Sequence, residues 1–329
     1  MSASRQQQLQ RELEALTRSV AVGSLARTQI EITGRDRSTF LNGFCTNDIK
    51  RLVPGGGCEA FMTNVQGKTI GYIYVFCGTE SLVIDSAAGQ AQAIIEHLDH
   101  YRVREQVVLH DRSNAWHELL VSGPQSAACL QQVCGAEVPV ELFCHATVPF
   151  RDQSVHVRRV PFLHPECLFV SGDGPVLADL QDQLVTAGAV ACGIEALDIR
   201  RVESGSPLFG VDISRTNLPQ EIDRNATAIS FRKGCYLGQE TVARLDALGH
   251  VNWRLRGIKF PGPVPPVAGT ELQTAEKSCA RITSVVESVQ LQTPLALAYV
   301  RAGLDLPGST WPTQFGTVEV VALPHQRDS

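Results

Sequence analysis

The 329-residue sequence contains no long hydrophobic run and no strong excess of charge of one sign. Its apolar stretches are short, such as residues 72–76, whereas a membrane-spanning helix needs roughly 18 consecutive apolar residues. The net charge is -5 and the isoelectric point is near 6.0. Because binding by counterion release needs a strongly basic face, we expect neither a membrane nor a nucleic acid as a direct partner.

The motifs of common hydrolases and zinc proteins are absent as well. The chain has no G-x-S-x-G, no H-E-x-x-H and no paired C-x-x-C, and these patterns carry nucleophile elbows and zinc sites. Gly67-Lys68-Thr69 resembles the end of a P-loop, but Met62 occupies the position of the first glycine. The sequence therefore predicts no bound metal and none of these enzyme classes.

Ten cysteines are present, yet they follow no regular spacing. The first twenty residues combine arginines with Glu12 and Glu14, which is unlike a transit peptide, and they lack the apolar core of a signal peptide. A disulfide framework belongs to small exported domains. We therefore expect a cytoplasmic monomer with reduced thiols.

Hydrophobic periodicity predicts an α+β region over residues 1–249 and a small antiparallel β-domain over residues 250–329. Leucines 9, 13 and 16 share one face of an expected first helix. The other predicted elements are strands at 30–32, 58–63, 69–76, 81–85, 116–121 and 168–171, helices at 36–41, 91–101, 124–133 and 193–201, and late strands at 253–260, 270–273, 280–288, 294–300 and 316–323.

One short stretch, residues 231–244, combines reactive and flexible residues. Gly234 and Gly238 bracket Cys235, and the apolar spacing after them predicts a helix that ends at Gly249. A cysteine at a helix amino terminus beside Arg232 and Lys233 is favoured as the thiolate. The alternative is an ordinary glycine-rich helix start in which the cysteine is incidental.

The residues 233–240, K-G-C-Y-L-G-Q-E, resemble the motif of the YgfZ branch of the folate-binding YgfZ/GcvT family. Residues 193–205 and the turn 63–68 are similar to further segments of that family. The resemblance implies a ring of three domains, with two intertwined α+β lobes around a folate cavity and a C-terminal antiparallel β-barrel. It also implies tetrahydrofolate as ligand.

The resemblance assigns roles to individual residues. It implies that Cys235 is the working thiol and that the carboxylate of Glu203 binds the pterin, whose 2-amino group and N3–H are two donors. The other implied folate contacts are Asn64, Arg232, Lys233, Tyr236 and Gln239.

The sequence departs from the aminomethyltransferase branch of that family. Gly71 and Tyr72 stand where that branch has an aspartate pair, and Phe209 replaces a tyrosine near the folate. A glycine offers no carboxylate, so glycine-cleavage activity is not expected.

Three hypotheses remain. The first is a folate-binding accessory protein for synthesis or repair of iron-sulfur enzymes, with client or assembly proteins as partners. The second is a tetrahydrofolate-dependent one-carbon transferase or demethylase acting on an amine. The third is a non-catalytic folate-binding adaptor. Gly71 weighs against the second hypothesis, and Cys235 weighs against the third.

Overall fold

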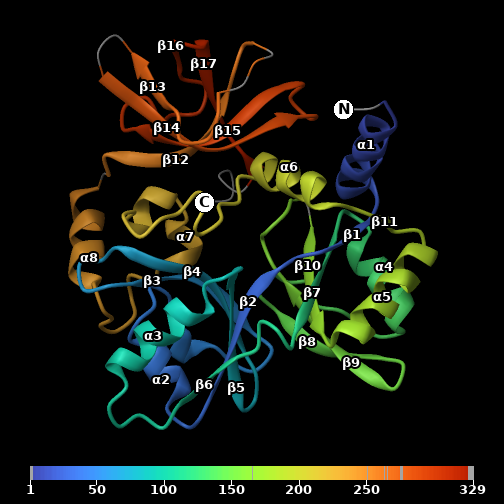
Figure 1. The fold of residues 1–329 in the computed structure, drawn as a ribbon. Coiled ribbons are helices and arrows are strands. Elements are labelled where there is room, and N and C mark those ends of the chain that lie inside the picture. Colours follow the sequence, from blue (N-terminus) through green and yellow to red (C-terminus); the bar gives the residue numbers. More distant parts are fainter. Residues whose placement is uncertain are drawn as a thin grey trace.

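Three β-sheets and the helices on their faces make up the chain (Figure 1). The computed structural model describes residues 3–164, 166–249, 251–262, 264, 266–274 and 277–324. Among these residues no helix is both long and apolar enough to cross a membrane.

The first sheet is antiparallel, with the strand order β3-β4-β5-β2-β6. Two helices cover one of its faces, and Ile30, Met62 and Ile94 are among the fully buried side chains between them. The elements are β2 (Arg27–Thr33), α2 (Arg37–Asn42), η1 (Ile49–Arg51), β3 (Gly57–Thr63), β4 (Thr69–Cys77), β5 (Ser81–Ala87), α3 (Ala91–Tyr101) and β6 (Val108–Asp111).

The second sheet has the order β11-β1-β7-β10-β9-β8, and only the pair β1 and β11 is parallel. Helices α4 and α5 cover its outer face (Figure 1). The elements are β1 (Ala21–Ser24), β7 (His117–Ser122), α4 (Ser126–Cys134), β8 (His145–Phe150), β9 (Gln153–Arg159), β10 (Cys167–Gly172), α5 (Gly174–Thr186) and β11 (Val190–Ala191).

The first strand of the chain belongs to the second lobe. Strand β1 belongs to the second sheet, while β2, which starts three residues later, belongs to the first. Helix α1 (Ala3–Arg18) precedes β1 and buries Leu13 and Leu16, as the leucine spacing predicts. The chain therefore passes between the lobes before either sheet is complete.

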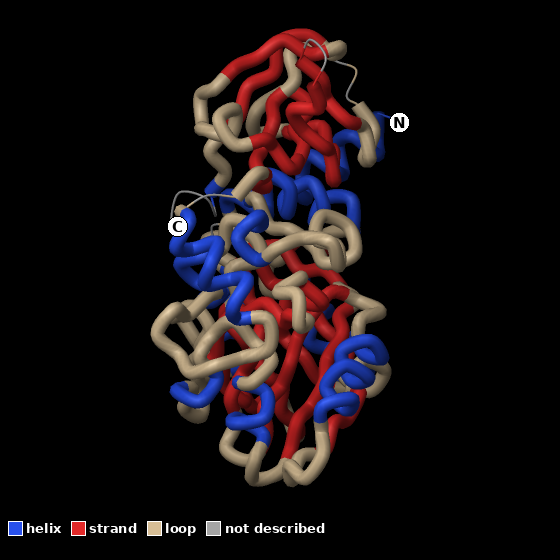
Figure 2. The backbone as a smooth tube through the Cα atoms, turned by 90° about the vertical axis from the view of Figure 1, so that its left-hand side faces the viewer, coloured by secondary structure: helices blue, strands red, loops and turns tan. Residues whose placement is uncertain are grey.

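The third sheet is antiparallel and nearly closed, with β13 and β16 at its two edges in contact. It occupies one end of the molecule (Figure 2). Its strands are β12 (Trp253–Lys259), β13 (Glu271–Thr274), β14 (Lys277–Ser288), β15 (Thr293–Arg301), β16 (Thr310–Thr313) and β17 (Gly316–Val321). The sequence predicted all of these but β16, where Pro312 lowers the strand signal at a sheet edge.

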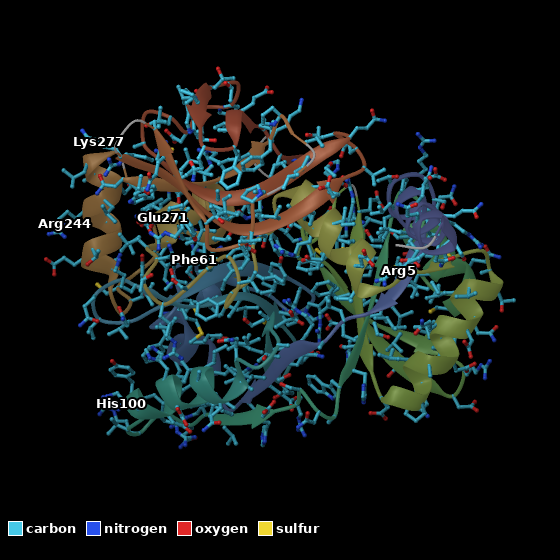
Figure 3. The ribbon with its side chains drawn as sticks, turned by 45° about the horizontal axis from the view of Figure 1, so that its top comes forward. Arg5, Phe61, His100, Arg244, Glu271 and Lys277 are labelled. Atoms are coloured by element: carbon cyan, nitrogen blue, oxygen red, sulfur yellow. The ribbon has the colours of Figure 1, made fainter. Side chains whose placement is uncertain are left out.

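The segment between the second and third sheets contains α6 (Ile194–Ser204), η2 (Pro219–Ile222), α7 (Asn225–Ala228) and α8 (Gln239–Leu248). Around it, side chains from all three sheets form one apolar cluster, which includes Phe61, Phe169 and Leu297. Figure 3 shows Phe61 in the interior, while His100 and Arg244 lie at the periphery.

One helix boundary was predicted wrongly. Helix α8 begins at Gln239, and Gly238 caps it with φ of 80°. Cys235 therefore lies in the preceding loop and outside the first helical turn. Because Gly238 takes a left-handed conformation, the helix cannot extend back to the cysteine without changing the backbone there.

Candidate functional site

Cys235 is the one exposed thiol among the ten cysteines. Burial raises the pKa of the Cys45 thiol to about 12, of Cys167 to about 12 and of Cys134 to about 11. A thiolate is the nucleophilic form, so these three thiols, of which Cys134 is partly buried, are poor nucleophiles at neutral pH. Accessibility thus separates Cys235 from the rest.

Lys233 holds the start of the loop that carries Cys235. Its Nζ donates to the backbone oxygens of Asn42 at 2.7 Å, Cys45 at 2.5 Å and Asn47 at 2.7 Å. The side chain is buried, and burial lowers the pKa of Lys233 to about 8. An ammonium has three donors, and here all three have partners, so Lys233 fastens the loop to the end of α2.

The other end of the loop is held equally firmly. Leu237 N–H donates to the oxygen of Gly43 at 2.9 Å, and Leu237 O accepts from Thr63 Oγ1 at 2.6 Å. A Cβ at Gly238 would lie only 2.3 Å from the oxygen of Asn64. The turn between β3 and β4 therefore packs tightly against the start of α8.

The remaining predicted residues of this loop differ in exposure. Tyr236 is buried, with its ring centroid 4.9 Å from the Nζ of Lys233. Arg232 is exposed, and Gln239 donates from its backbone N to Tyr236 O at 3.1 Å. Asn64, Lys233, Tyr236 and Gln239 are thus brought together around the loop of Cys235.

Glu203 lies apart from this group, on the last turn of α6. Its Oε1 accepts from Ser288 Oγ at 2.6 Å and from Gln290 N–H at 3.1 Å, and its Oε2 accepts from Arg200 Nη1 at 3.1 Å. Ser288 is the last residue of β14, and Gln290 lies in the turn between β14 and β15. Glu203 therefore ties α6 to the third sheet.

Glu203 also lines a cavity of about 370 Å³, together with Gln290, Leu295 and the segment 319–324. Within that segment Leu323 is buried, and it fills the space left by the absent side chains of Gly205 and Gly257. A Cβ at either glycine would approach Leu323 to 2.9 or 2.8 Å. The chain end thus forms one wall of the cavity beside Glu203.

Beside β4 the space between the two lobes is filled mainly by aromatic rings. A void of only about 10 Å³ remains at this place, lined by Arg27, Tyr72, Tyr74, Phe162 and Phe209 among others. Tyr72 and Tyr74 project from β4, and Phe162 comes from the second lobe. The cavity beside Glu203, rather than this void, has ligand-sized space.

A buried carboxylate at the centre was missed by sequence reasoning. Glu59 on β3 accepts from Tyr72 Oη at 2.5 Å and from Arg224 Nη2 at 3.0 Å, and Thr227 Oγ1 also bonds it. Burial and the Glu59 carboxylate both raise the pKa of Tyr72, while Arg224 opposes the shift. Glutamates are common on the surface, so no sequence signal distinguishes this one.

Gly71 faces the opposite side of β4. A Cβ there would meet Ile73, Ile94 and Met62 at 3.6 to 3.8 Å, inside the apolar core under α3. Successive side chains of a strand point to opposite faces, so Tyr72 takes the central face. A carboxylate at position 71 would thus point away from Glu59 and the central cluster.

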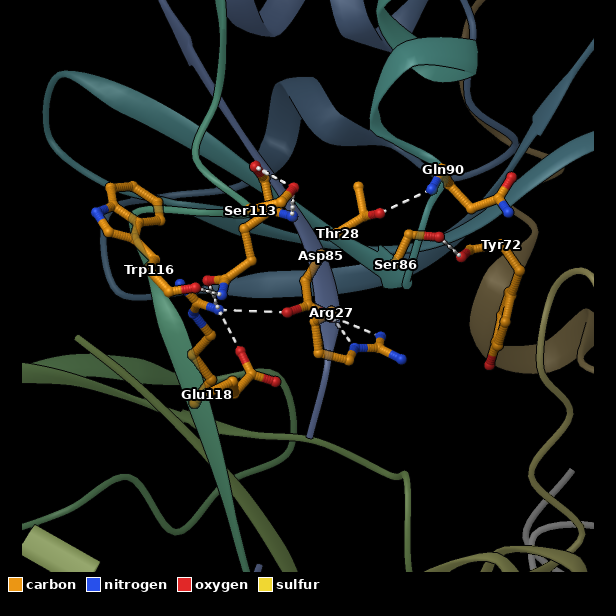
Figure 4. A network of polar contacts seen from close by, with 11 residues as sticks. Arg27, Thr28, Tyr72, Asp85, Ser86, Gln90, Ser113, Trp116 and Glu118 are labelled. Atoms are coloured by element: carbon orange, nitrogen blue, oxygen red, sulfur yellow. Dashed lines mark hydrogen bonds and ion pairs between the residues drawn. The ribbon is translucent and has the colours of Figure 1, made fainter. Parts of the chain in front are cut away.

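A second buried charge network joins the two lobes, and Figure 4 shows part of it. Arg27 Nε donates to Asp85 Oδ1 at 2.8 Å. Arg158 Nη1 lies 3.4 Å from Asp85 Oδ2 and 3.3 Å from Glu118 Oε2. We call these four residues the seam network. Its members come from β2, β5, β9 and β7, so their proximity is a product of the topology.

Comparisons with known proteins agree with this architecture. The family model of the GCVT N-terminal domain matches residues 2–233, and the chain belongs to this family. The aminomethyltransferase of a Nostoc species is 27% identical over 310 residues, covering 91% of this chain and 81% of that protein. The aminomethyltransferase of Streptomyces avermitilis is 26% identical over 323 residues, covering 91% of this chain and 84% of that protein.

A solved structure shows the same fold. The glycine cleavage system aminomethyltransferase T from Bartonella henselae superposes with a TM-score of 0.86 at 18% identity, over 96% of this chain and 89% of that chain. The fold is therefore that of an aminomethyltransferase, with its mixed α/β lobes and a nearly closed C-terminal sheet.

Tetrahydrofolate, which the family implies, is compatible with the residues beside Glu203. Among the residues that the structure describes, Oε2 of Glu203 has a single donor, Arg200, so it retains a lone pair for a pterin N–H. The adjoining space of about 370 Å³ falls within the roughly 300–1,000 Å³ of small-molecule sites. Among the described residues, no group of three or more histidine, cysteine or acidic side chains is placed to hold a metal.

Proposed function

We propose that this chain is a tetrahydrofolate-dependent transferase or demethylase that moves a one-carbon unit to or from an amine. The observation that carries the proposal is the family match over residues 2–233, with relatives named aminomethyltransferase that span 91% of the chain. The cavity beside Glu203 supports it, because Glu203 lines ligand-sized space. Tetrahydrofolate supplies nitrogen atoms that carry the one-carbon unit.

Glu59 and Tyr72 support transfer chemistry at the centre. A side chain at position 71 would point into the apolar core, whereas the carboxylate of Glu59 contacts the hydroxyl of Tyr72. The central cluster therefore contains a carboxylate even though residue 71 is a glycine. The resemblance places the aspartate that is essential for glycine cleavage at position 71, where this chain has a glycine. The proposed acceptor or donor is therefore an amine other than the aminomethyl-lipoyl carrier of glycine cleavage.

Calorimetric titration with tetrahydrofolate tests the ligand. We expect wild type to bind and Glu203→Gln to bind at least about tenfold more weakly, a difference of about 1.4 kcal/mol. Glu195→Gln, on the exposed start of the same helix, is the matched control and should bind like wild type. Equal binding by the Glu203 variant contradicts its assignment, and absence of binding by all three contradicts the ligand.

Turnover is tested with tetrahydrofolate, aminomethyl-lipoyl carrier and a panel of N-methyl amines. We expect formation of a one-carbon folate with an amine of the panel and no ammonia release from the carrier above background. Ammonia release at an enzymatic rate would identify a glycine-cleavage enzyme. Failure with every donor would favour a role without turnover.

The exposed thiol supports a second candidate, the accessory role in synthesis or repair of iron-sulfur enzymes. Cys235 is exposed on a loop held at both ends, which is the arrangement expected of a thiol that meets another protein. Deleting the gene and assaying iron-sulfur enzymes, with Cys235→Ser and Cys134→Ser as complementing variants, tests this candidate. Full complementation by Cys235→Ser would contradict it.

A further inference from the structure

A cavity between α1, α6 and the third sheet lies apart from the sites discussed so far. It measures about 600 Å³, and we call it the edge groove. Leu9 on α1 and Ile199 on α6 line one side, and residues 285–287 of β14 with Val289 of the following turn line the other. Figure 1 shows α6 beneath the third sheet and α1 beside α6.

The floor of the edge groove is apolar. Leu9, Ile199 and Val286 belong to the central apolar cluster, and Val285 packs against the core of the third sheet. Val289 at the margin is 49% exposed. Covering such side chains removes apolar surface from water and is therefore favourable.

The half of β14 that lines the groove has an open edge. Strand β13 pairs with β14 only as far as Arg281, and Gly269 and Thr270 extend this pairing to Ile282. Beyond that point β15 pairs with β14 on its other side, but no described strand pairs with residues 284–288 on the side of β13. An open edge offers unpaired backbone N–H and C=O groups to another strand.

The register identifies the backbone groups that face outward. Pro294 O accepts from Phe260 N–H on β12 at 3.1 Å, so Pro294 turns its backbone groups away from β14. In an antiparallel pair both opposed residues face each other or both face away. Glu287, which is opposite Pro294, therefore presents its N–H and C=O at the open edge, and by alternation so does Val285, opposite Ala296.

The charge at the groove is negative. The charged residues that line it are all acidic, namely Glu195, Asp198 and Glu287. Glu195 pairs with Arg5 at 2.7 Å, and Asp198 accepts from Arg201, whose guanidinium also holds Asp212. Glu287 is exposed and has no cation paired with it within the described residues. The carboxylates therefore outnumber the cations that pair with them.

We infer that the edge groove binds an extended segment of a partner protein, in which apolar residues alternate with lysine or arginine. The segment adds to the open edge of β14 as an antiparallel strand and bonds the backbone groups of Val285 and Glu287. The rest of this sheet is antiparallel, and antiparallel pairing is the more stable arrangement per residue.

The alternation of the segment follows from the two faces of β14. Successive side chains of a strand point to opposite faces, so Val286 faces the apolar floor while Glu287 faces the other way. Directly opposed residues of two strands share a face. The residues of the segment that bond Val285 and Glu287 are therefore the basic ones, and the residues between them cover the floor.

Fluorescence anisotropy with a labelled peptide, acetyl-Lys-Val-Lys-Val-Lys-Val-Lys-amide, tests the inference at about 0.15 M salt, where distant charges are screened. We expect saturable binding by the wild-type protein. The matched peptide with glutamate in place of lysine should bind at least about tenfold more weakly. Equal binding of the two peptides contradicts the charge preference and overturns the inference.

Two methylated forms of the lysine peptide test strand addition itself. Methyl groups on the amide nitrogens of its lysines remove the donors that face β14, whereas methyl groups on those of its valines lie on the far edge. We expect at least about tenfold weaker binding from the first form and less than about threefold from the second. Equal binding of the two forms overturns the antiparallel strand.

Glu287→Lys tests the position on the protein, because it reverses the charge at the open edge. We expect lysine-peptide affinity to fall at least about tenfold. Glu271→Lys is the matched control, since Glu271 is an exposed residue of the same sheet that Figure 3 shows far from Arg5 of α1. Equal affinities of the two variants place binding elsewhere. If Glu287→Lys does not fold, the methylated peptides still decide with wild type.

The inference goes beyond the proposed function, because binding of the segment requires neither folate nor an amine substrate. Peptide binding without folate binding would refute the transferase proposal alone. Folate binding and turnover without peptide binding would refute the edge groove as a docking site and leave the transferase proposal intact.

Discussion

The loop of Cys235 and the seam network both contain buried charge, but they handle it in opposite ways. Lys233 gives its three donors to three neutral backbone carbonyls, whereas in the seam network the guanidinium groups of Arg27 and Arg158 pair with the carboxyl groups of Asp85 and Glu118. A buried charge that has all its partners fixes a structure, and removal of one member of a buried ion pair leaves the other uncompensated. The comparison therefore predicts that loss of Arg158 costs more stability than loss of Lys233.

Arg158→Met should produce the largest effect, because it removes the arginine paired with Glu118 and one of the two arginines paired with Asp85. Leaving buried charges unpaired costs about 3–5 kcal/mol. Urea denaturation measures the free energy of unfolding. Arg151→Met removes an exposed ion pair with Asp179 and should cost less than about 1 kcal/mol. Equal costs for the two arginines would show that the seam network does not hold the lobes together.

Gly238→Ala should destabilise the protein by about 3 kcal/mol, since the backbone has φ of 80° and the new Cβ would lie 2.3 Å from Asn64 O. Gly234→Ala is the control, because no atom lies within 4 Å of its Cβ position. We expect the control to stay within about 0.5 kcal/mol of wild type. Similar losses would mean that the loop is not anchored at Gly238.

Lys233 should make stability depend on alkaline pH. Its pKa is lowered to about 8 in the folded protein from 10.5, so between these values the unfolded chain binds the additional proton and stability rises with pH. Below about pH 8 Lys233 is protonated in both the folded and the unfolded protein, so its contribution to the free energy of unfolding does not change with pH. Lys233→Met should cost roughly 2 kcal/mol at neutral pH and abolish the rise. Urea denaturation of wild type and Lys233→Met at both ends of this pH window measures the effect. If the free energy of unfolding rises equally with pH in both proteins, Lys233 is not the cause of the rise.

Cys235→Ser should have the smallest effect on folding, below about 1 kcal/mol, because the thiol is exposed. Mass spectrometry after brief iodoacetamide treatment should find Cys235 alkylated first. Cys45→Ser, at a fully buried site, should cost more. Faster alkylation of any other cysteine in the folded protein would contradict the separation by accessibility.

The sequence predicted most elements because their periodicity is local. The meander 58–85 and the helix 91–101 appear within two residues of their expected bounds. It did not predict the seam network, because the ion pairs form only when strands that are far apart in the sequence come together. The residues concerned are Arg27, Asp85, Glu118 and Arg158. Nor did it predict that Glu203 bonds Ser288, which lies 85 residues further along the chain.

The place of β1 in the second sheet, although the whole first lobe follows it in the chain, has a consequence for synthesis on the ribosome. Ala21 pairs with Ser122 and Val190, so β1 cannot complete its pairing until these residues have been synthesised. In contrast, β2 to β5 pair with one another within residues 27–87. Contacts between distant residues form slowly because the intervening loop must close first. The first lobe can therefore assemble while the amino terminus is still unpaired, and no single cut in the chain yields two separately foldable lobes.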